Sequence, residues 1–169
     1  LGEGQDALII DTRPNTVYPK GFIPNSIFIG IDDNFAIWVG ALITDLKQPI
    51  LFIAEPGREE EVVTRLARVG YDHALGFLKG GFDTWIKADK EIDTLEEIDA
   101  KTLFELSKSN EISVLDIRKI SEFNTEHVAA AQNFPLDFIN NNMSELSIDK
   151  KYYVHCAGGY RSVIASSIL

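Results

Sequence analysis

The sequence has one cysteine, Cys156, among its 169 residues. A single cysteine excludes an internal disulfide framework and a zinc site built on several cysteines. The three histidines, His73, His127 and His155, are widely spaced and show no metal-ligand spacing. We therefore expect no metal and no other cofactor. Cysteine this scarce also favours a reducing compartment, which predicts a cytoplasmic protein.

The sequence also lacks a long apolar run and an excess of basic residues. No run approaches the length of a membrane span and no signal-peptide pattern opens the chain, so we expect no membrane partner. Lysine and arginine number 16 against 26 acidic residues, for a formal net charge of −10. This balance argues against nucleic acid as a partner, because phosphates require a basic face. An anionic ligand would have to be attracted locally, against the field of the whole chain.

A glycine-bearing loop surrounds the lone thiol. A short β-prone stretch at 152–154 precedes Cys156, and an apolar segment at 162–169 that is typical of a helix follows it. A strand would thus deliver the thiol to a helix N-terminus, where amide groups have no internal partner and the helix dipole adds positive charge. A lone cysteine is often only a small buried hydrophobe, so the surrounding residues decide between the two interpretations.

The residues around Cys156 favour a reactive thiol. Gly158 and Gly159 let the backbone turn its amide groups inward and let a ligand approach closely. Arg161 adds a permanent cation. Such surroundings favour the thiolate, which is the reactive form of cysteine, and they favour an anion bound on or beside the sulfur. We therefore predict that Cys156 is a nucleophile.

The two halves of the chain repeat one pattern. Apolar strands at 7–13 and 113–118 both end in Asp-x-Arg. Later strands at 49–53 and 151–154 each run into a loop and then a helix, which we expect at 60–69 in the first half. This alternation of strands and helices predicts an α/β fold of two tandem domains, each with a mainly parallel sheet flanked by helices.

We place the domains at 1–90 and 91–169, joined by a polar linker near 87–97. A helix with Thr102 as its N-cap is expected near the start of the second domain. The second domain lacks a counterpart to the segment that follows the loop helix in the first. We therefore expect it to be truncated at its C-terminus and to belong to a longer polypeptide.

Four markers together resemble the rhodanese-like family of sulfurtransferases. They are the Asp-x-Arg strand ends, the turn at 21–24, the loop from Cys156 to Arg161 and the Gly-Gly-x-x-x-Trp sequence at 80–85. The resemblance covers essentially the whole chain as two tandem units. It implies that Cys156 takes sulfane sulfur from thiosulfate or a persulfide, carries it as a persulfide and passes it to a thiol or another nucleophile. A small sulfur donor and a thiol acceptor are therefore the implied partners.

The resemblance also implies roles for the residues around the cysteine. The loop amides that would bind the persulfide or the donor anion belong to Ala157, Gly158, Gly159 and Tyr160. Arg161 would be the loop cation. Asp116 and Arg118 are of catalytic types, but such a pair at a strand end more often pins loops through hydrogen bonds and an ion pair. We assign these two residues a supporting role.

Other functions stay open on the sequence. The related dual-specificity phosphatases and arsenate reductases have one more loop residue, which makes room for a tetrahedral oxyanion. The six residues from Cys156 to Arg161 argue against that chemistry. A non-catalytic interaction module is a further alternative. The chain also looks like the C-terminal part of fusions with a metallo-β-lactamase-fold domain, which predicts an additional fused or docked domain as a partner.

The first domain departs from the pattern in its loop. Aligning the two units places Glu55 at the position of Cys156 and Glu60 at that of Arg161. A carboxylate cannot carry sulfane sulfur, and it would repel an anionic donor. Pro56 also removes one amide donor from this loop. We predict that the first domain is catalytically silent and serves to support the active domain or to dock another.

Overall fold

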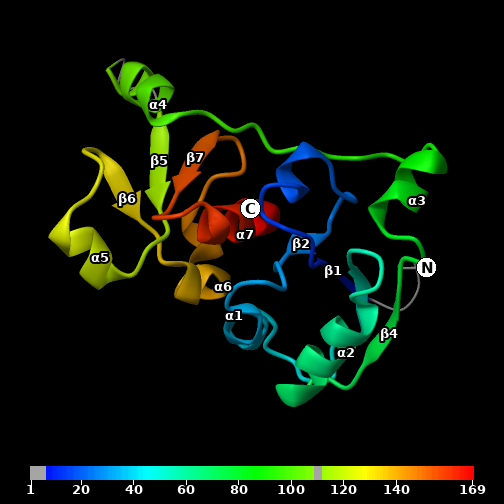
Figure 1. Ribbon diagram of the computed structural model, residues 1–169. Helices are drawn as coiled ribbons and strands as arrows, with labels where there is room; N and C mark the ends of the chain where they lie inside the picture. Colours follow the sequence, from blue (N-terminus) through cyan, green and yellow to red (C-terminus); the bar gives the residue numbers. More distant parts are fainter. Residues whose placement is uncertain (1–6, 109–111) are drawn as a thin grey trace. The chain divides into compact units, whose positions relative to one another are not determined.

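The computed structural model describes residues 7–108 and 112–169, and the chain divides into two compact units, Leu1–Leu95 and Glu96–Leu169 (Figure 1). Backbone hydrogen bonds explain why the first unit extends to Leu95. Phe22 and Asp93 exchange two of them, at 2.9 and 3.0 Å, and the Leu95 amide donates to the Pro19 carbonyl at 2.9 Å. The segment 93–95 therefore belongs to the first unit, beyond the limit at residue 90 that the linker composition predicts.

Between residues 7 and 95, the first unit contains a four-stranded parallel sheet with the order β2-β1-β3-β4. Its two central strands are apolar and largely buried, as expected for a parallel sheet that helices cover. The strands are β1 (Leu8–Asp11), β2 (Ile27–Phe28), β3 (Ile50–Ile53) and β4 (Ala74–Phe77).

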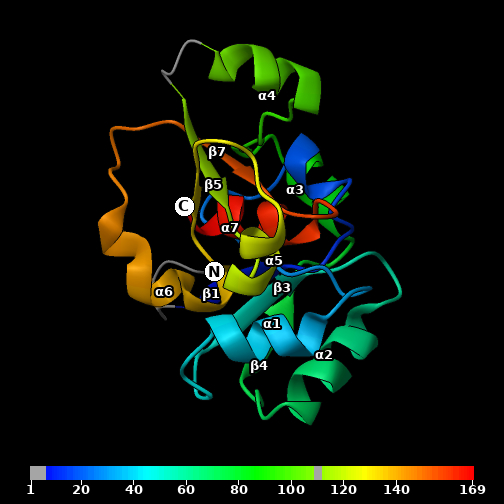
Figure 2. The same cartoon turned by 90° about the vertical axis from the view of Figure 1, so that its left-hand side faces the viewer.

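The helices of the first unit bury apolar faces against this sheet. In α2 (Glu59–Arg68), Val62 and Leu66 are fully buried at helical spacing, which confirms the helix predicted at 60–69. This helix lies beside α1 (Phe35–Leu42) (Figure 2). The helix α3 (Phe82–Lys87) adds Phe82 to a core with Ile23 and Ile53. A 3₁₀ helix spans Tyr18–Lys20.

The second unit contains, in its described residues, a three-stranded parallel sheet with the order β6-β5-β7. The helix that follows β7 packs against that strand (Figure 1). The strands are β5 (Ser113–Asp116), β6 (Ala131–Asn133) and β7 (Tyr152–His155). The helices are α4 (Ala100–Ser107), α5 (Ile120–Thr125), α6 (Ile139–Asn142) and α7 (Tyr160–Ile168), with 3₁₀ helices at Leu136–Phe138 and Met143–Glu145.

The two units thus confirm the predicted α/β class with mainly parallel sheets flanked by helices. One detail of the sequence prediction is wrong. The N-cap of α4 is Asp99, whose Oδ1 accepts from the Thr102 amide at 2.7 Å, so Thr102 lies inside the helix. Aspartate and threonine both suit this position, and the chain uses the one at which the backbone is still extended.

Candidate active site

Cys156 is the first residue after β7, at the carboxyl end of the parallel sheet. The strand is fixed up to its last residue, because the His155 carbonyl accepts from the Ile117 amide at 3.2 Å. Four residues then separate β7 from α7, which begins at Tyr160. The carboxyl ends of the strands are where open α/β sheets bind ligands. The cysteine side chain is half-buried there and faces the loop.

The sulfur of Cys156 accepts a hydrogen bond from the backbone of its own loop. The Gly159 amide donates to Sγ at 3.1 Å. Gly159 has a φ of +85°, a left-handed conformation that favours glycine because a Cβ would clash. Ser162 Oγ lies 3.6 Å from Sγ and donates to the Gly159 carbonyl at 2.9 Å. The turn therefore aims a donor at the sulfur, and negative charge on Sγ or on a second sulfur bonded to it would be stabilised.

The mouth of the loop is open. Ala157 and Gly158 are exposed, and Tyr160 is half-buried at the start of α7. A Cβ placed on Gly158 would meet no described atom within 4 Å. A small molecule therefore has room to approach the sulfur over the backbone of this residue.

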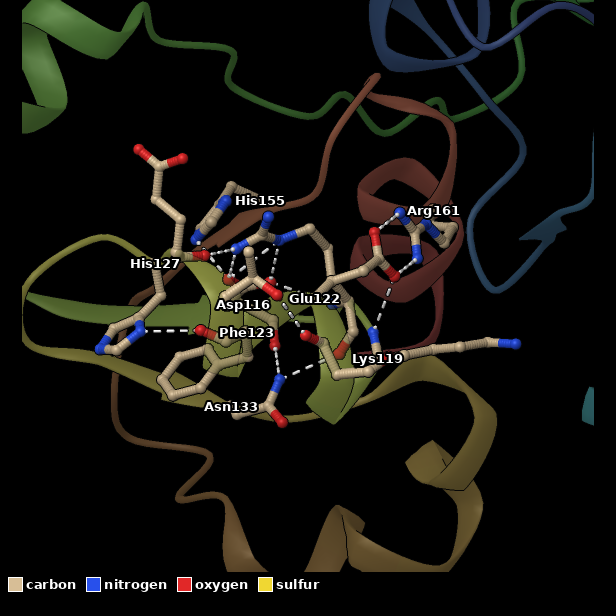
Figure 3. Close-up of polar contacts among 12 residues, drawn as sticks. Asp116, Lys119, Glu122, Phe123, His127, Asn133, His155 and Arg161 are labelled. Atoms are coloured by element: carbon tan, nitrogen blue, oxygen red, sulfur yellow. Dashed lines mark hydrogen bonds and ion pairs between the residues drawn. The ribbon is translucent and has the colours of Figure 1, made fainter.

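Arg161 is held by a carboxylate that the sequence analysis missed (Figure 3). Its Nη1 and Nη2 donate to the two oxygens of Glu122 in α5, at 2.7 and 2.9 Å. The hydrogen bonds from Arg161 lower the pKa of Glu122 from its ordinary 4.5 to about 2, and the pair also raises the pKa of Arg161. The Lys119 amide donates to the same carboxylate at 3.1 Å. Because the two residues lie 39 positions apart, no local sequence signal links them.

Asp116 and Arg118 form a pin at the end of β5. Arg118 Nε donates to Asp116 Oδ1 at 2.9 Å, and Arg118 Nη2 donates to the Glu126 carbonyl at 2.7 Å. Asp116 is fully buried. Its burial opposes ionisation, but the hydrogen bonds from Arg118 outweigh it and lower the pKa of Asp116. The pin ties the turn after α5 to the strand, and this is the supporting geometry expected of the pair.

His155 is the last residue of β7 and is half-buried. Its Nε2 is buried without a hydrogen-bond partner in the described residues. Asp116 Oδ2 is 3.6 Å away, beyond hydrogen-bond distance (Figure 3). The reason is that Arg118 already donates to both oxygens of Asp116.

The strand register shows which residues of the two loops correspond. The aspartate of each Asp-x-Arg motif pairs with Ile53 in the first unit and with His155 in the second. The next residues therefore correspond as well, which places Ala54 at the position of Cys156. The expectation that Glu55 occupies this position is wrong. Ala54 is apolar and buried. From the sequence alone it is therefore easily counted as the last residue of the strand, which moves the predicted loop by one position.

The same register holds through the turn. Gly57, with a φ of +92°, lies where Gly159 has its left-handed conformation. Two residues further on, Glu59 rather than Glu60 corresponds to Arg161. The Gly57 amide donates to Glu59 Oε2 at 2.8 Å. The first unit therefore has a glycine with the same left-handed φ at this position, but a carboxylate accepts the hydrogen bond that the sulfur accepts in the second.

Comparison with known proteins identifies the family of this chain. The family described as "Rhodanese-like domain" matches residues 1–88 and 99–169. The chain belongs to the rhodanese-like family. Its tandem units each carry one match, and Ala54 of the first rhodanese-like unit occupies the position that Cys156 has in the second.

Individual relatives of this rhodanese-like chain are distant. The uncharacterized protein YqhL of Bacillus subtilis (strain 168) is 32% identical over 56 residues, which cover 33% of this chain and 44% of that protein. The match thus spans less than half of the relative. The rhodanese-like domain of Alr3790 from Anabaena sp. is 20% identical with a TM-score of 0.50, covering 56% of this chain and 98% of that one, and it shares the fold. A 3-mercaptopyruvate sulfotransferase, SseA from Escherichia coli, is 18% identical with a TM-score of 0.46, covering 98% and 88%.

Two further findings concern the described residues only. No helix among them is long and apolar enough to cross a membrane. No group of three histidine, cysteine, aspartate or glutamate side chains among them has the geometry to hold a metal ion.

Proposed function

We propose that this chain is a sulfurtransferase in which Cys156 carries sulfane sulfur as a persulfide. The donor is thiosulfate or a persulfide, and the acceptor is a thiol or another nucleophile. The observation that carries the proposal is the Gly159 amide, which donates to Sγ at 3.1 Å at the carboxyl end of a rhodanese-like sheet. A free thiol is required, so we also propose the reducing cytoplasm as its compartment.

The reaction has two steps, each a thiol–disulfide type of exchange at sulfur. The Cys156 thiolate attacks the outer sulfur of the donor, an Sγ–S bond forms, and the donor's S–S bond breaks with its electron pair leaving on sulfite or on a thiolate. An acceptor thiolate then attacks the outer sulfur of the Cys156 persulfide. The new S–S bond forms on the acceptor and the Cys156 thiolate leaves, which restores the starting state.

Loop amides and the open mouth suit this chemistry. The Gly159 amide already meets Sγ, and the amides of Ala157, Gly158 and Tyr160 border the same turn. A persulfide adds one sulfur atom beyond Sγ. The exposed backbone of Gly158 leaves room for this atom. Amide donors stabilise the charge that develops there without a positively charged side chain in direct contact.

The first unit is, in this proposal, catalytically silent. Ala54 has no nucleophile, Pro56 corresponds to Gly158 and lacks an amide hydrogen, and Glu59 corresponds to Arg161. A carboxylate beside the turn would also repel an anionic donor. Its role is then to support the second unit or to dock an additional domain.

The test is the intact mass of the protein after incubation with thiosulfate or glutathione persulfide, with Cys156→Ser as the matched control. Because Cys156 is the only cysteine, a mass gain needs no further site mapping. We expect a gain of one sulfur atom on the wild-type chain alone, reversed by cyanide. An unchanged mass with every donor, on protein whose thiol still reacts with iodoacetamide, would contradict the proposal.

A further inference from the structure

The guanidinium of Arg161 is paired with a carboxylate of the same unit. Both of its terminal nitrogens donate to Glu122, at 2.7 and 2.9 Å, in a fork-to-fork ion pair. Glu122 is anchored in turn by the Lys119 amide, while the Lys119 ammonium group extends away from the pair (Figure 3). The carboxylate stays ionised throughout the neutral range, because its pKa is lowered to about 2 by Arg161. The loop cation is therefore matched by a permanent anion.

The second arginine of this unit is matched in the same way. Arg118 is paired with the buried carboxylate of Asp116. Both arginines of the second unit thus have a carboxylate partner, which reduces the positive field that they contribute around Cys156. The chain as a whole carries a formal charge of −10. A compact dianion approaching the sulfur therefore meets an amide donor and an arginine whose charge is partly balanced by Glu122.

The first unit lacks this ion pair. The spacing from the Asp-x-Arg motif places Val17 at the position of Glu122, because Arg13 donates to the Gly21 carbonyl as Arg118 does to that of Glu126. Glu59 stands at the position of the loop arginine. The ion pair and the cysteine thus occur together in one unit and are both absent from the other, which associates the pair with the chemistry of the sulfur rather than with the fold.

We propose that Glu122 selects the sulfur donor by neutralising Arg161, so that Cys156 is loaded from an alkyl persulfide in preference to thiosulfate. This inference rests on the proposed function. An alkyl persulfide brings at most one negative charge to the reacting sulfurs, whereas thiosulfate brings two on a compact ion. Removing the charge of Glu122 while keeping a hydrogen-bonding side chain releases one positive charge on Arg161, next to the loop.

The favoured step balances without another reactant. The Cys156 thiolate attacks the outer sulfur of R–S–SH, the Sγ–S bond forms, the S–S bond of the donor breaks, and R–S⁻ leaves with the electron pair. The outer sulfur keeps its proton and remains on the enzyme as Cys156–S–SH. With thiosulfate the same attack releases sulfite, and the complex of thiolate and donor carries three negative charges instead of one.

The test compares Glu122→Gln with Glu126→Gln. Each variant removes one acidic charge from the same turn region, but only Glu122 contacts Arg161. The loading rate constant of Cys156 is measured by quenching with iodoacetamide and intact mass, with thiosulfate and with cysteine persulfide as donors. We expect Glu122→Gln to raise the thiosulfate constant about fivefold and to change the persulfide constant less than about twofold. Glu126→Gln should change neither by more than about twofold.

A second measurement needs no variant. On the wild-type protein the thiosulfate constant should rise with ionic strength, because salt screens the repulsion between a dianion and the acidic protein. The rise should be smaller for cysteine persulfide. A thiosulfate constant that falls with added salt would indicate a net positive loop and would overturn the inference.

The remaining outcomes are equally decisive. A Glu122→Gln variant in which both constants fall together would make Glu122 a positioning residue for the loop and would overturn its role in selection, as would an unchanged ratio of the two constants. If neither donor loads wild-type Cys156, the proposed function itself fails. That result is distinct from loading without selectivity.

Discussion

The two loops have a glycine amide at corresponding positions, and the two amides donate to different side chains. In the second unit the Gly159 amide donates to the sulfur of Cys156 at 3.1 Å. In the first unit the corresponding Gly57 amide donates to Glu59 at 2.8 Å. Both glycines have a left-handed φ, so the two loops share this feature of the backbone. The difference teaches that the turn is a property of the fold, while the chemistry depends on which side chain meets the amide.

Both units have the Asp–Arg ion pair at the end of a strand, which we call the pin in each, but the burial of the two pins differs. Arg13 Nε donates to Asp11 Oδ1 at 2.9 Å, as Arg118 does to Asp116. Arg13 has 8% of its side chain exposed and Arg118 has 18%. Burial therefore outweighs the arginine and raises the pKa of Asp11, whereas the pKa of Asp116 is lowered. The first unit has the more deeply buried pin, as expected if its role is structural.

The comparison is tested most severely by giving the first unit a cysteine. We expect the double variant Ala54→Cys, Cys156→Ser to load sulfur roughly a thousandfold more slowly than the wild type, because Pro56 lacks an amide hydrogen and Glu59 occupies the amide of Gly57. Loading is followed by intact mass with thiosulfate and cysteine persulfide. A rate near that of the wild type would show that the loop side chains do not set the difference between the units.

Replacing the aspartate of each Asp–Arg pair should lower the unfolding free energy of the two units by different amounts. Asp11→Ala leaves the buried Arg13 without its partner and should cost about 3–5 kcal/mol of unfolding free energy. Asp116→Ala should cost less, because water can reach Arg118 more easily. Both tryptophans, Trp38 and Trp85, belong to the first unit, so their fluorescence during urea unfolding reports that unit alone.

Far-UV circular dichroism provides the complementary readout for the whole chain. Asp11→Ala should shift the tryptophan transition, and Asp116→Ala should leave it in place while shifting part of the dichroism transition. Equal destabilisation by the two variants would contradict the link between burial of the arginine and the strength of the pin.

The sequence was sufficient for the architecture because its signals there are local. Apolar strands, Asp-x-Arg ends and the spacing of Val62 and Leu66 each follow from contacts within one element. The alignment of the loops was not predictable to the residue. Ala54 suits the end of a strand and the start of a loop equally well, and only the ladder between β1 and β3 shows where the strand stops.

The candidate site was predictable only in part for a similar reason. The cysteine, the glycines and the arginine lie within six residues, and their chemistry is visible in the sequence. The partner of that arginine is on another element, so Glu122 emerges only when α5 and α7 are placed in space. The Nε2 of His155 is buried without a hydrogen bond from any described residue, which is likewise a consequence of how Arg118 occupies Asp116.

The smallest effect we predict concerns the pH dependence of the pair found in the second unit alone. The pKa of Glu122 is lowered from 4.5 to about 2, mainly by Arg161, so its contribution to stability is complete above pH 4.5 and is lost as the pH falls toward 2. Solvent screens a pair in which 35% of the glutamate side chain is exposed, which limits the contribution to about 1 kcal/mol.

The wild type should therefore be more stable than Glu122→Gln by about 1 kcal/mol at neutral pH, and the two should converge as the pH approaches 2. Chemical unfolding followed by circular dichroism across this range measures the difference, with Glu126→Gln as the control. Taking the difference between variants removes the titration of Asp11 and Asp116, which both proteins share. A constant gap at all pH values would mean that Glu122 stabilises the loop by packing, and the ion pair would then not distinguish the two units energetically.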